Sequence, residues 1–201
     1  MGRTWVSMAL LGLRLKRAGY EVHLFGYSPR KESLDQLTQR LQATVSGSVQ
    51  APSFHFIGHS LGNIIVRNGF RTGFGSRLKR IVMLSPPNGP AALASSLRSS
   101  RVYRWLTGES GQKLADGEFY KQLPIPTVEF GIIAGDKGHR ITFNEPNDGV
   151  VRVENTKLSG MTDWVLVHHT HTFIMLANDT FALCTRFLRT GSFQRQRKTI
   201  S

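Results

Sequence analysis

The chain has 201 residues, of which 40% are hydrophobic and 9% aromatic, so it is a globular protein with a real core and not a disordered one. Lys and Arg number 26 against 13 Asp and Glu, and this formal net charge of +13 favours anionic partners. The single cysteine, Cys184, excludes an internal disulfide and a cysteine zinc cluster, and its apolar neighbours indicate a buried position.

The chain alternates short apolar runs with segments of helical spacing. In order, the first half predicts a helix at 5–18, a strand at 21–27, a helix capped by Ser33, a strand at 53–57 and a helix at 61–70. The rest of the chain predicts strands at 80–84 and 127–134, a short extended piece at 150–153, a strand at 164–167 and a final helix at 172–188. Continuous apolar strands that alternate with helices predict the α/β class, with a mostly parallel sheet and helices on both faces.

Two segments fall outside this alternation. Residues 90–125 predict no strand and contain a weakly amphipathic piece with Leu93, Leu97 and Trp105. The basic tail at 192–201 is expected to be disordered. We therefore expect a single domain over residues 1–191.

The motif Gly58-His59-Ser60-Leu61-Gly62 lies where a predicted strand passes into a predicted helix. A serine at this junction could simply cap the helix, with glycines that allow close packing. The strand–turn–helix context favours another interpretation, in which a sharp turn presents the Ser60 hydroxyl above the sheet as a nucleophile. The backbone N–H of Leu61 would then donate to a reacting oxyanion at the helix N-terminus.

A serine nucleophile needs a base, and a histidine cluster follows the last predicted strand. His168, His169 and His171 lie at the carboxyl end of that strand, where open parallel sheets form their active sites. His171 is the preferred base because the final helix begins directly behind it, whereas the other two are expected to pack or to support it. A zinc site made by all three is a minor alternative, since no carboxylate ligand or helical pair accompanies them.

The acid that would orient the base has two candidates. Asp136 directly follows the strand at 127–134, and Asp148 lies in an Asn-Asp-Gly segment that could be only a turn. Either carboxylate could hold the imidazole in one tautomer and stabilise its protonated form. Position along the chain leaves the two open.

Three motifs taken together resemble the α/β-hydrolase superfamily, in particular its small bacterial lipase- and esterase-like members. They are Gly58-His59-Ser60-Leu61-Gly62, Asn147-Asp148-Gly149-Val150-Val151 and His171-Thr172-Phe173. The order Ser, Asp, His agrees with that fold, and the resemblance covers residues 4–189. It implies ester hydrolysis through an acyl-enzyme without a cofactor, favours Asp148 over Asp136, and implies a lid or cap at 90–125. An acyltransferase or thioesterase would use the same triad.

The resemblance also implies a departure from the family pattern. In that fold a strand ending in a His-Gly segment precedes the first helix and supplies the second oxyanion N–H. The sequence starts at Met1, at the loop after that strand, so we expect an N-terminally truncated chain with Met1 near the oxyanion hole. Without a signal-peptide pattern, the chain is expected to be cytoplasmic.

The basic charge supports an alternative of another class. No acidic residue occurs between Asp35 and Glu109, and five cations cluster there: Arg67, Arg71, Arg77, Lys79 and Arg80. A catalytically impaired hydrolase-like scaffold could use this surface to bind anionic membrane or nucleic acid, although no nucleic-acid motif is present. For the hydrolase we expect a small-molecule ester or lipid substrate.

Overall fold

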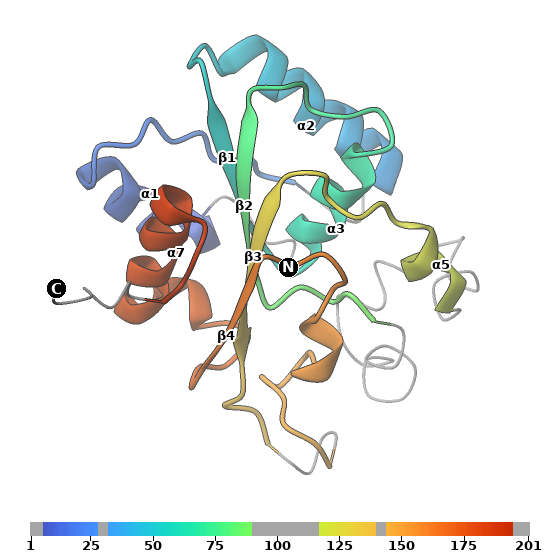
Figure 1. Ribbon diagram of the computed structural model, residues 1–201, viewed down its shortest axis with the longest axis vertical. Coiled ribbons are helices and arrows are strands. Elements are labelled where there is room, and N and C mark those ends of the chain that lie inside the picture. The colour runs from blue at the N-terminus through green and yellow to red at the C-terminus, as the bar shows by residue number, and fades with distance from the viewer. Residues whose placement is uncertain (1–5, 28–31, 90–116, 140–143, 195–201) are drawn as a thin grey trace, which may run out of the picture.

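A computed structural model describes residues 6–27, 32–89, 117–139 and 144–194. Its centre is a four-stranded sheet in the order β1-β2-β3-β4, and all three neighbouring pairs are parallel (Figure 1). The strands are β1 (Phe54–His59), β2 (Leu78–Leu84), β3 (Glu129–Gly135) and β4 (Asp163–Val167). The predicted parallel α/β architecture is confirmed.

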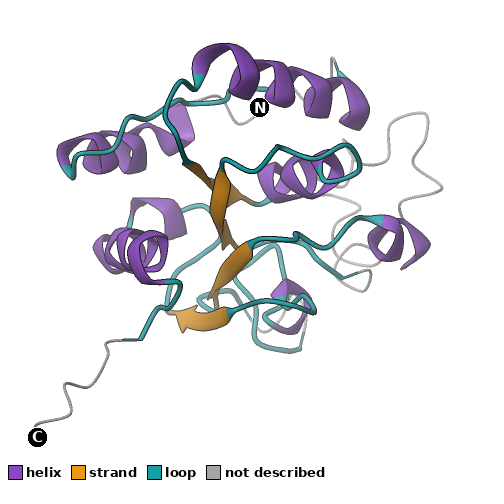
Figure 2. Ribbon diagram, turned by 45° about the horizontal axis from the view of Figure 1, so that its top comes forward, coloured by secondary structure: helices purple, strands orange, loops and turns teal. Residues whose placement is uncertain are grey.

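Helices cover both faces of this sheet (Figure 2). The helices are α1 (Val6–Arg17), α2 (Leu34–Ser48), α3 (Leu61–Gly69), α5 (Gly117–Gln122) and α7 (Asn178–Thr190). Strand side chains alternate between two cores, because successive residues of a strand point to opposite faces. In β2, Val82 and Leu84 pack with α1 and α7, whereas Ile81 and Met83 pack with α2 and α3.

The predicted cap of α2 is present. The Ser33 hydroxyl accepts a hydrogen bond from the Gln36 backbone N–H at 3.2 Å, and the Gln36 side chain accepts one from the Ser33 N–H at 2.8 Å. This reciprocal pair satisfies two donors that a helix start leaves open. It fixes the start of the helix that covers β1 on one face.

The strand predicted at 21–27 is not formed. These residues follow α1 without secondary structure, and no described strand pairs with them. A strand exists only through hydrogen bonds to a neighbour. The apolar run at 21–27 is typical of a strand, but among the described residues no neighbouring strand pairs with it.

Two predictions for the second half of the chain need correction. The final helix is divided into a 3₁₀ turn (Ile174–Leu176) and α7, because Ala177 has an extended backbone with ψ of 145°. The piece at 150–153 is a turn region, followed by a 3₁₀ turn at Glu154–Thr156. The prediction of disorder from residue 192 is also wrong for Phe193, which is buried against Phe187.

Two members of the predicted cation cluster, Arg67 and Arg80, are bound within the protein. Arg67 is 1% exposed and donates to the carbonyls of Pro124, Tyr120 and Leu123, and burial lowers its pKa to about 10. Arg80 pairs with Glu129. Arg67 thus joins α3 to residues 120–124, and Arg80 joins β2 to β3. Among the described residues no helix combines the length and apolar character needed to cross a membrane.

Candidate active site

Ser60 lies in a sharp turn between the end of β1 and the start of α3. Its φ of 52° and ψ of −122° are strained for a residue with a side chain. Its side chain makes no capping hydrogen bond to α3. The helix-cap interpretation is therefore wrong, and the turn instead lifts the hydroxyl toward the carboxyl end of the sheet.

The glycine before the turn is required for its packing. A Cβ at Gly58 would collide with the side chain of Asn63. Asn63 Nδ2 donates to the carbonyls of Ser60 at 3.1 Å and Leu84 at 3.3 Å, which ties the turn to β2. At Gly62 an added Cβ would find only the Tyr27 hydroxyl, 3.8 Å away. Of the two glycines in the motif, only Gly58 is at a position where a larger side chain would clash with its neighbours.

Ser60, His171 and Asp148 form one chain of hydrogen bonds. Ser60 Oγ lies 2.9 Å from His171 Nε2, and His171 Nδ1 lies 2.7 Å from Asp148 Oδ2. All three residues are at most 2% exposed. The carboxylate accepts from Nδ1–H, so Nε2 is the acceptor for the serine proton. The structure brings together the three residues that the sequence predicted.

Asp148 is held as an anion by its surroundings. Burial alone would raise the pKa of Asp148, but the charge of His171 and the hydrogen bonds from His171 and the Val151 N–H outweigh it. The net effect is a pKa below the ordinary value of a carboxyl group. Its Oδ1 accepts the N–H groups of Val150 at 2.9 Å and Val151 at 2.7 Å. Oδ2 therefore stays directed at the imidazole.

Comparison with solved structures identifies the fold of the chain. No family model and no curated protein matches the chain. Among solved structures, the lipase BlEst2 of Bacillus licheniformis in its mature form has a TM-score of 0.66 and 18% identity, over 92% of this chain and 83% of that one. Tomato methylketone synthase I complexed with 2-tridecanone has a TM-score of 0.60 and 12% identity, over 92% and 93%. An extracellular α/β-hydrolase of a Paenibacillus species has a TM-score of 0.58 and 13% identity, over 94% of each chain.

The chain has the α/β-hydrolase fold. Identities between 12% and 18% carry the fold alone, so its activity has to be argued from the site. In the α/β-hydrolase fold the nucleophile, the acid and the base follow successive strands in that order along the chain. Ser60 after β1, Asp148 after β3 and His171 after β4 agree with that order.

The other acid and the other histidines of the cluster lie outside the triad. His168 Nδ1 is 2.8 Å from Asp136 Oδ1, with side chains 74% and 30% exposed. His169 Nε2 lies 2.8 Å from Asp179. Asp136 is thus not the acid of the triad. Each histidine of the cluster therefore contacts a different carboxylate, and no group of three or more potential metal ligands occurs within the described ranges.

Two positioning residues were missed by the sequence interpretation. His59 Nε2 lies 2.9 Å from the carbonyl of His171 and fixes the loop that carries the base. Gly135 lets that loop approach, since a Cβ there would collide with the carbonyl of His169 and lie 3.0 Å from Asp148 Cβ. The sequence did contain features that could have indicated them. His59 lies inside the Gly58–Gly62 motif, and Gly135 ends a predicted strand just before the two candidate acids.

The backbone N–H of Leu61, the predicted oxyanion donor, lies at the start of α3 directly after Ser60. Leu61 is the first residue of α3, and its N–H donates to no backbone carbonyl of the described segments. A helix N-terminus concentrates partial positive charge, so this N–H is suited to a developing oxyanion next to Ser60. Met1, the other predicted donor, lies outside the described residues.

Proposed function

We propose that the protein hydrolyses carboxylic esters through an acyl-enzyme intermediate. The observation that carries the proposal is the buried chain of hydrogen bonds from Ser60 through His171 to Asp148. A hydroxyl becomes an effective nucleophile only when a base of matched geometry removes its proton. The lipase and the α/β-hydrolase with the same fold are consistent with this reaction class.

In the acylation step, His171 Nε2 takes the Ser60 proton while Oγ attacks the ester carbonyl carbon. The Leu61 N–H donates to the oxyanion of the tetrahedral intermediate. When the intermediate collapses, the bond to the alcohol oxygen breaks and His171 returns the proton to the leaving alcohol. Asp148 remains ionised and stabilises the imidazolium throughout.

In the deacylation step, water replaces the alcohol. His171 takes a proton from the water as its oxygen attacks the acyl carbon, and then returns that proton to Ser60 Oγ as the carboxylic acid leaves. No cofactor takes part in either step.

An apolar ester or lipid is the substrate class that the surroundings favour. Phe173 is 61% exposed and lies two residues after the base. An exposed aromatic side chain this near to the proposed base in the chain could offer contact area to an acyl or alcohol group.

Ser60→Ala tests the proposal with a fluorophosphonate probe and p-nitrophenyl esters. We expect no labelling and a fall in ester turnover of about 10³-fold or more, since removal of a triad nucleophile has effects of this size or larger. Ser76→Ala, at an exposed serine in the turn before β2, is the matched control and should keep both activities. Unchanged turnover in a folded Ser60→Ala protein would show that the proposal is wrong.

A further inference from the structure

Ser85 carries a buried hydroxyl at the end of β2 that the proposed reaction does not use. Its backbone N–H donates to the Ile133 carbonyl of β3 at 2.9 Å. The carbonyl of Leu84, the residue before it, accepts the Ser60 N–H at 3.0 Å. Ser85 therefore lies between the strand that leads to the serine and the strand that leads toward the acid.

The order of the strands places Ser85 beneath the hydrogen-bonded chain of the triad. β2 lies between β1 and β3 in the sheet (Figure 1). Ser60 follows β1, and Asp148 packs at the end of β3, where Gly135 leaves room for it. The path from Ser60 to Asp148 therefore passes over the carboxyl end of β2, where Ser85 is located.

The backbone of Ser85 has an unfavourable conformation for a residue with a side chain. Its φ of 41° lies in the left-handed region, which glycine adopts freely. The nucleophile Ser60 is another described residue with such a φ, of 52°. Strain of this kind persists where the surrounding structure imposes it, and it gathers at functional sites. Since glycine would fit this position better, the serine side chain itself requires an explanation.

The hydroxyl of Ser85 lies close to the carboxylate of Asp148. Ser85 is 0% exposed, and no described residue is in full hydrogen-bond geometry with its Oγ. Burial raises the pKa of Asp148, and the groups that together bring this pKa below the ordinary value are His171, the Val151 N–H and the Ser85 hydroxyl. The hydroxyl is thus near enough to favour the charged carboxylate, although the contact is not yet a well-formed hydrogen bond.

Asp148 has room for another donor. Its Oδ1 accepts the N–H groups of Val150 and Val151, and its Oδ2 accepts from His171 Nδ1. An ionised carboxylate offers about four acceptor positions, so these three donors leave one position on Oδ2. Catalytic hydrogen bonds are often long in a free enzyme and shorten once the substrate is bound.

We propose that Ser85 is a positioning residue whose hydroxyl donates to the Asp148 carboxylate during the reaction. The inference rests on the proposed function, because it adds a member to the same triad. When His171 takes the Ser60 proton, the hydroxyl holds the carboxylate in place opposite the imidazolium. Ser85 acts through Asp148, since a side chain with no exposed surface does not touch a substrate.

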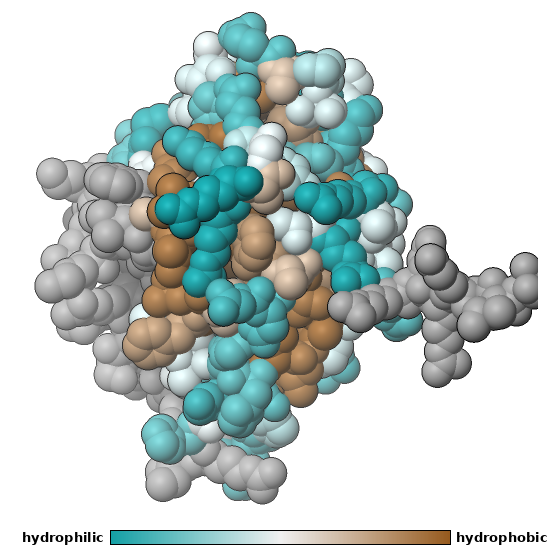
Figure 3. All heavy atoms as spheres, turned by 90° about the vertical axis from the view of Figure 1, so that its left-hand side faces the viewer, coloured by the Kyte–Doolittle hydropathy of each residue, from teal (hydrophilic) through white to brown (hydrophobic). Residues whose placement is uncertain are grey.

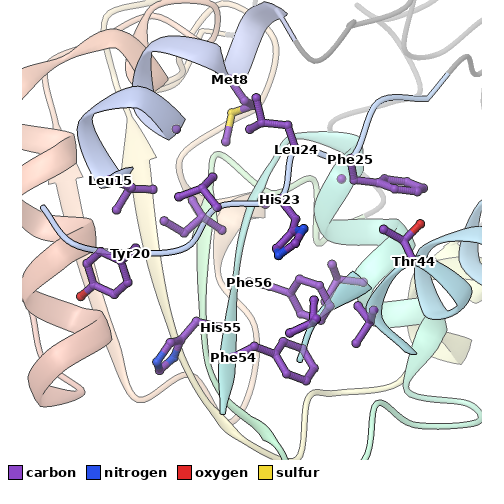
Figure 4. A pocket seen from close by; sticks show the side chains of 18 of the residues that line it. Met8, Leu15, Tyr20, His23, Leu24, Phe25, Thr44, Phe54, His55 and Phe56 are labelled. Atoms are coloured by element: carbon purple, nitrogen blue, oxygen red, sulfur yellow. The ribbon is translucent and has the colours of Figure 1, made fainter. Parts of the chain in front are cut away.

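Ser85 is also separate from the groove that lies along β1. This groove has a volume of about 390 Å³ (Figure 4). Most of its lining comes from α1, the segment 19–25, α2 and β1, and it includes neither Ser85 nor Asp148. A change at Ser85 therefore alters neither the molecular surface nor the groove, and we expect its effect in kcat and not in KM.

Ser85→Ala and Ser85→Gly together test the proposal. Both remove the hydroxyl, but only glycine relieves the positive φ. We expect kcat for a p-nitrophenyl ester to fall about tenfold in both, as for the loss of one hydrogen bond to a charged group. Ser85→Gly should nevertheless unfold at a higher urea concentration than Ser85→Ala. A wild-type kcat in both variants would overturn the proposal, and so would a loss in Ser85→Ala alone, which would belong to the backbone.

Thr180→Val is the matched control. Thr180 is also 0% exposed, and its Oγ1 has no hydrogen-bond partner in the described part of the chain. It belongs to α7, which lies on the side of the molecule that faces the viewer in Figure 3, where hydrophobic and hydrophilic residues are mixed. Loss of this hydroxyl should leave kcat unchanged. A fall equal to that of the Ser85 variants would show that any buried hydroxyl has the same effect, and would overturn the proposal.

A double variant shows whether Ser85 acts through Asp148. In an Asp148→Ala background, Ser85→Gly should lower the rate at which a fluorophosphonate labels Ser60 by less than about twofold, because the group that the hydroxyl orients is already absent. In the wild-type background the same change should lower this rate about tenfold. Equal losses in the two backgrounds would overturn the proposal.

A spectroscopic measurement separates this inference from the proposed function. The proton between His171 Nδ1 and Asp148 Oδ2 gives a downfield NMR signal that does not depend on ester turnover. Ser85→Gly should move this signal further downfield, because a carboxylate that loses one donor accepts more strongly from the other. An unmoved signal in the folded variant would overturn the role of Ser85. A moved signal in a protein that hydrolyses no ester would support the contact and overturn only the proposed function.

Discussion

Two histidine–carboxylate pairs lie close together in the chain and differ in almost everything except their contact distance. His171 and Asp148 are 2.7 Å apart with side chains 3% and 1% exposed, and His168 and Asp136 are 2.8 Å apart with side chains 74% and 30% exposed. Only the first pair reaches a third group, Ser60. The contact distance therefore does not distinguish the two pairs. They differ in burial and in whether the other ring nitrogen of the histidine contacts a third residue, as His171 Nε2 contacts Ser60.

The backbone explains why the two pairs separate. Asp136 directly follows β3, and its N–H donates to the Val167 carbonyl, so its side chain remains at the rim beside His168. Asp148 lies in a later turn at the same end of the sheet, and its backbone carbonyl accepts the His171 N–H at 2.8 Å. Gly135 leaves room for this return. These backbone contacts thus leave Asp136 beside the exposed His168 and bring Asp148 to the buried His171.

Removal of the two histidines should give the largest contrast. We expect His171→Ala to lower kcat for ester hydrolysis by about 10⁴-fold, because the serine loses its base, and His168→Ala to change it by less than about twofold. Steady-state kinetics with a p-nitrophenyl ester measures both. A similar loss in the two variants would contradict the assignment of the base.

Removal of the charge of each acid should give the next contrast. Asp148→Asn is expected to lower kcat by about 10³- to 10⁴-fold, since an amide can hold the imidazole in the wrong tautomer. Asp136→Asn should remain near the wild-type rate, because its carboxylate contacts only an exposed histidine. Equal losses of kcat in the two variants would contradict the choice of Asp148 over Asp136 as the acid.

The sequence predicted which residues form the Ser60–His171–Asp148 hydrogen-bonded chain better than it predicted their surroundings. Ser60 and His171 could be found because each follows a recognisable strand and precedes a helical pattern. Asp148 could not be separated from Asp136 by position, since the path of a loop depends on contacts such as that of Gly135, and only the family resemblance favoured it. The prediction of a strand at 21–27 was wrong for a related reason. An apolar pattern indicates that one segment can form a strand, but it does not show which neighbouring strand would pair with it.

A smaller effect should follow from the glycine that lets the buried pair form. Gly135→Ala should lower the free energy of unfolding by about 1–3 kcal/mol, as expected for overpacking in a filled core, because the added methyl meets His169 and Asp148. Ester turnover should fall as well, since Asp148 is displaced. Gly47→Ala is the matched control: this helical glycine has no atom near its Cβ position, and the change should add about 0.5–1 kcal/mol. Urea unfolding followed by circular dichroism measures both, and an unchanged midpoint for Gly135→Ala would contradict the close approach.

The smallest effect concerns the dependence of stability on pH. The pKa of Asp148 is lower in the folded protein than its ordinary value of 3.8, so the folded state favours the charged carboxylate. Its stabilising contribution is then complete above that ordinary value and is lost as pH falls through it toward the folded pKa. In Asp148→Asn this dependence is absent, so the stability difference between wild type and variant should shrink as the pH is lowered from 6 to about 3. Asp136→Asn removes a partly exposed carboxylate and should follow the wild-type curve. Denaturant midpoints measured across this range test the contrast, and a constant difference between wild type and Asp148→Asn would show that the buried pair does not stabilise the fold through its charge.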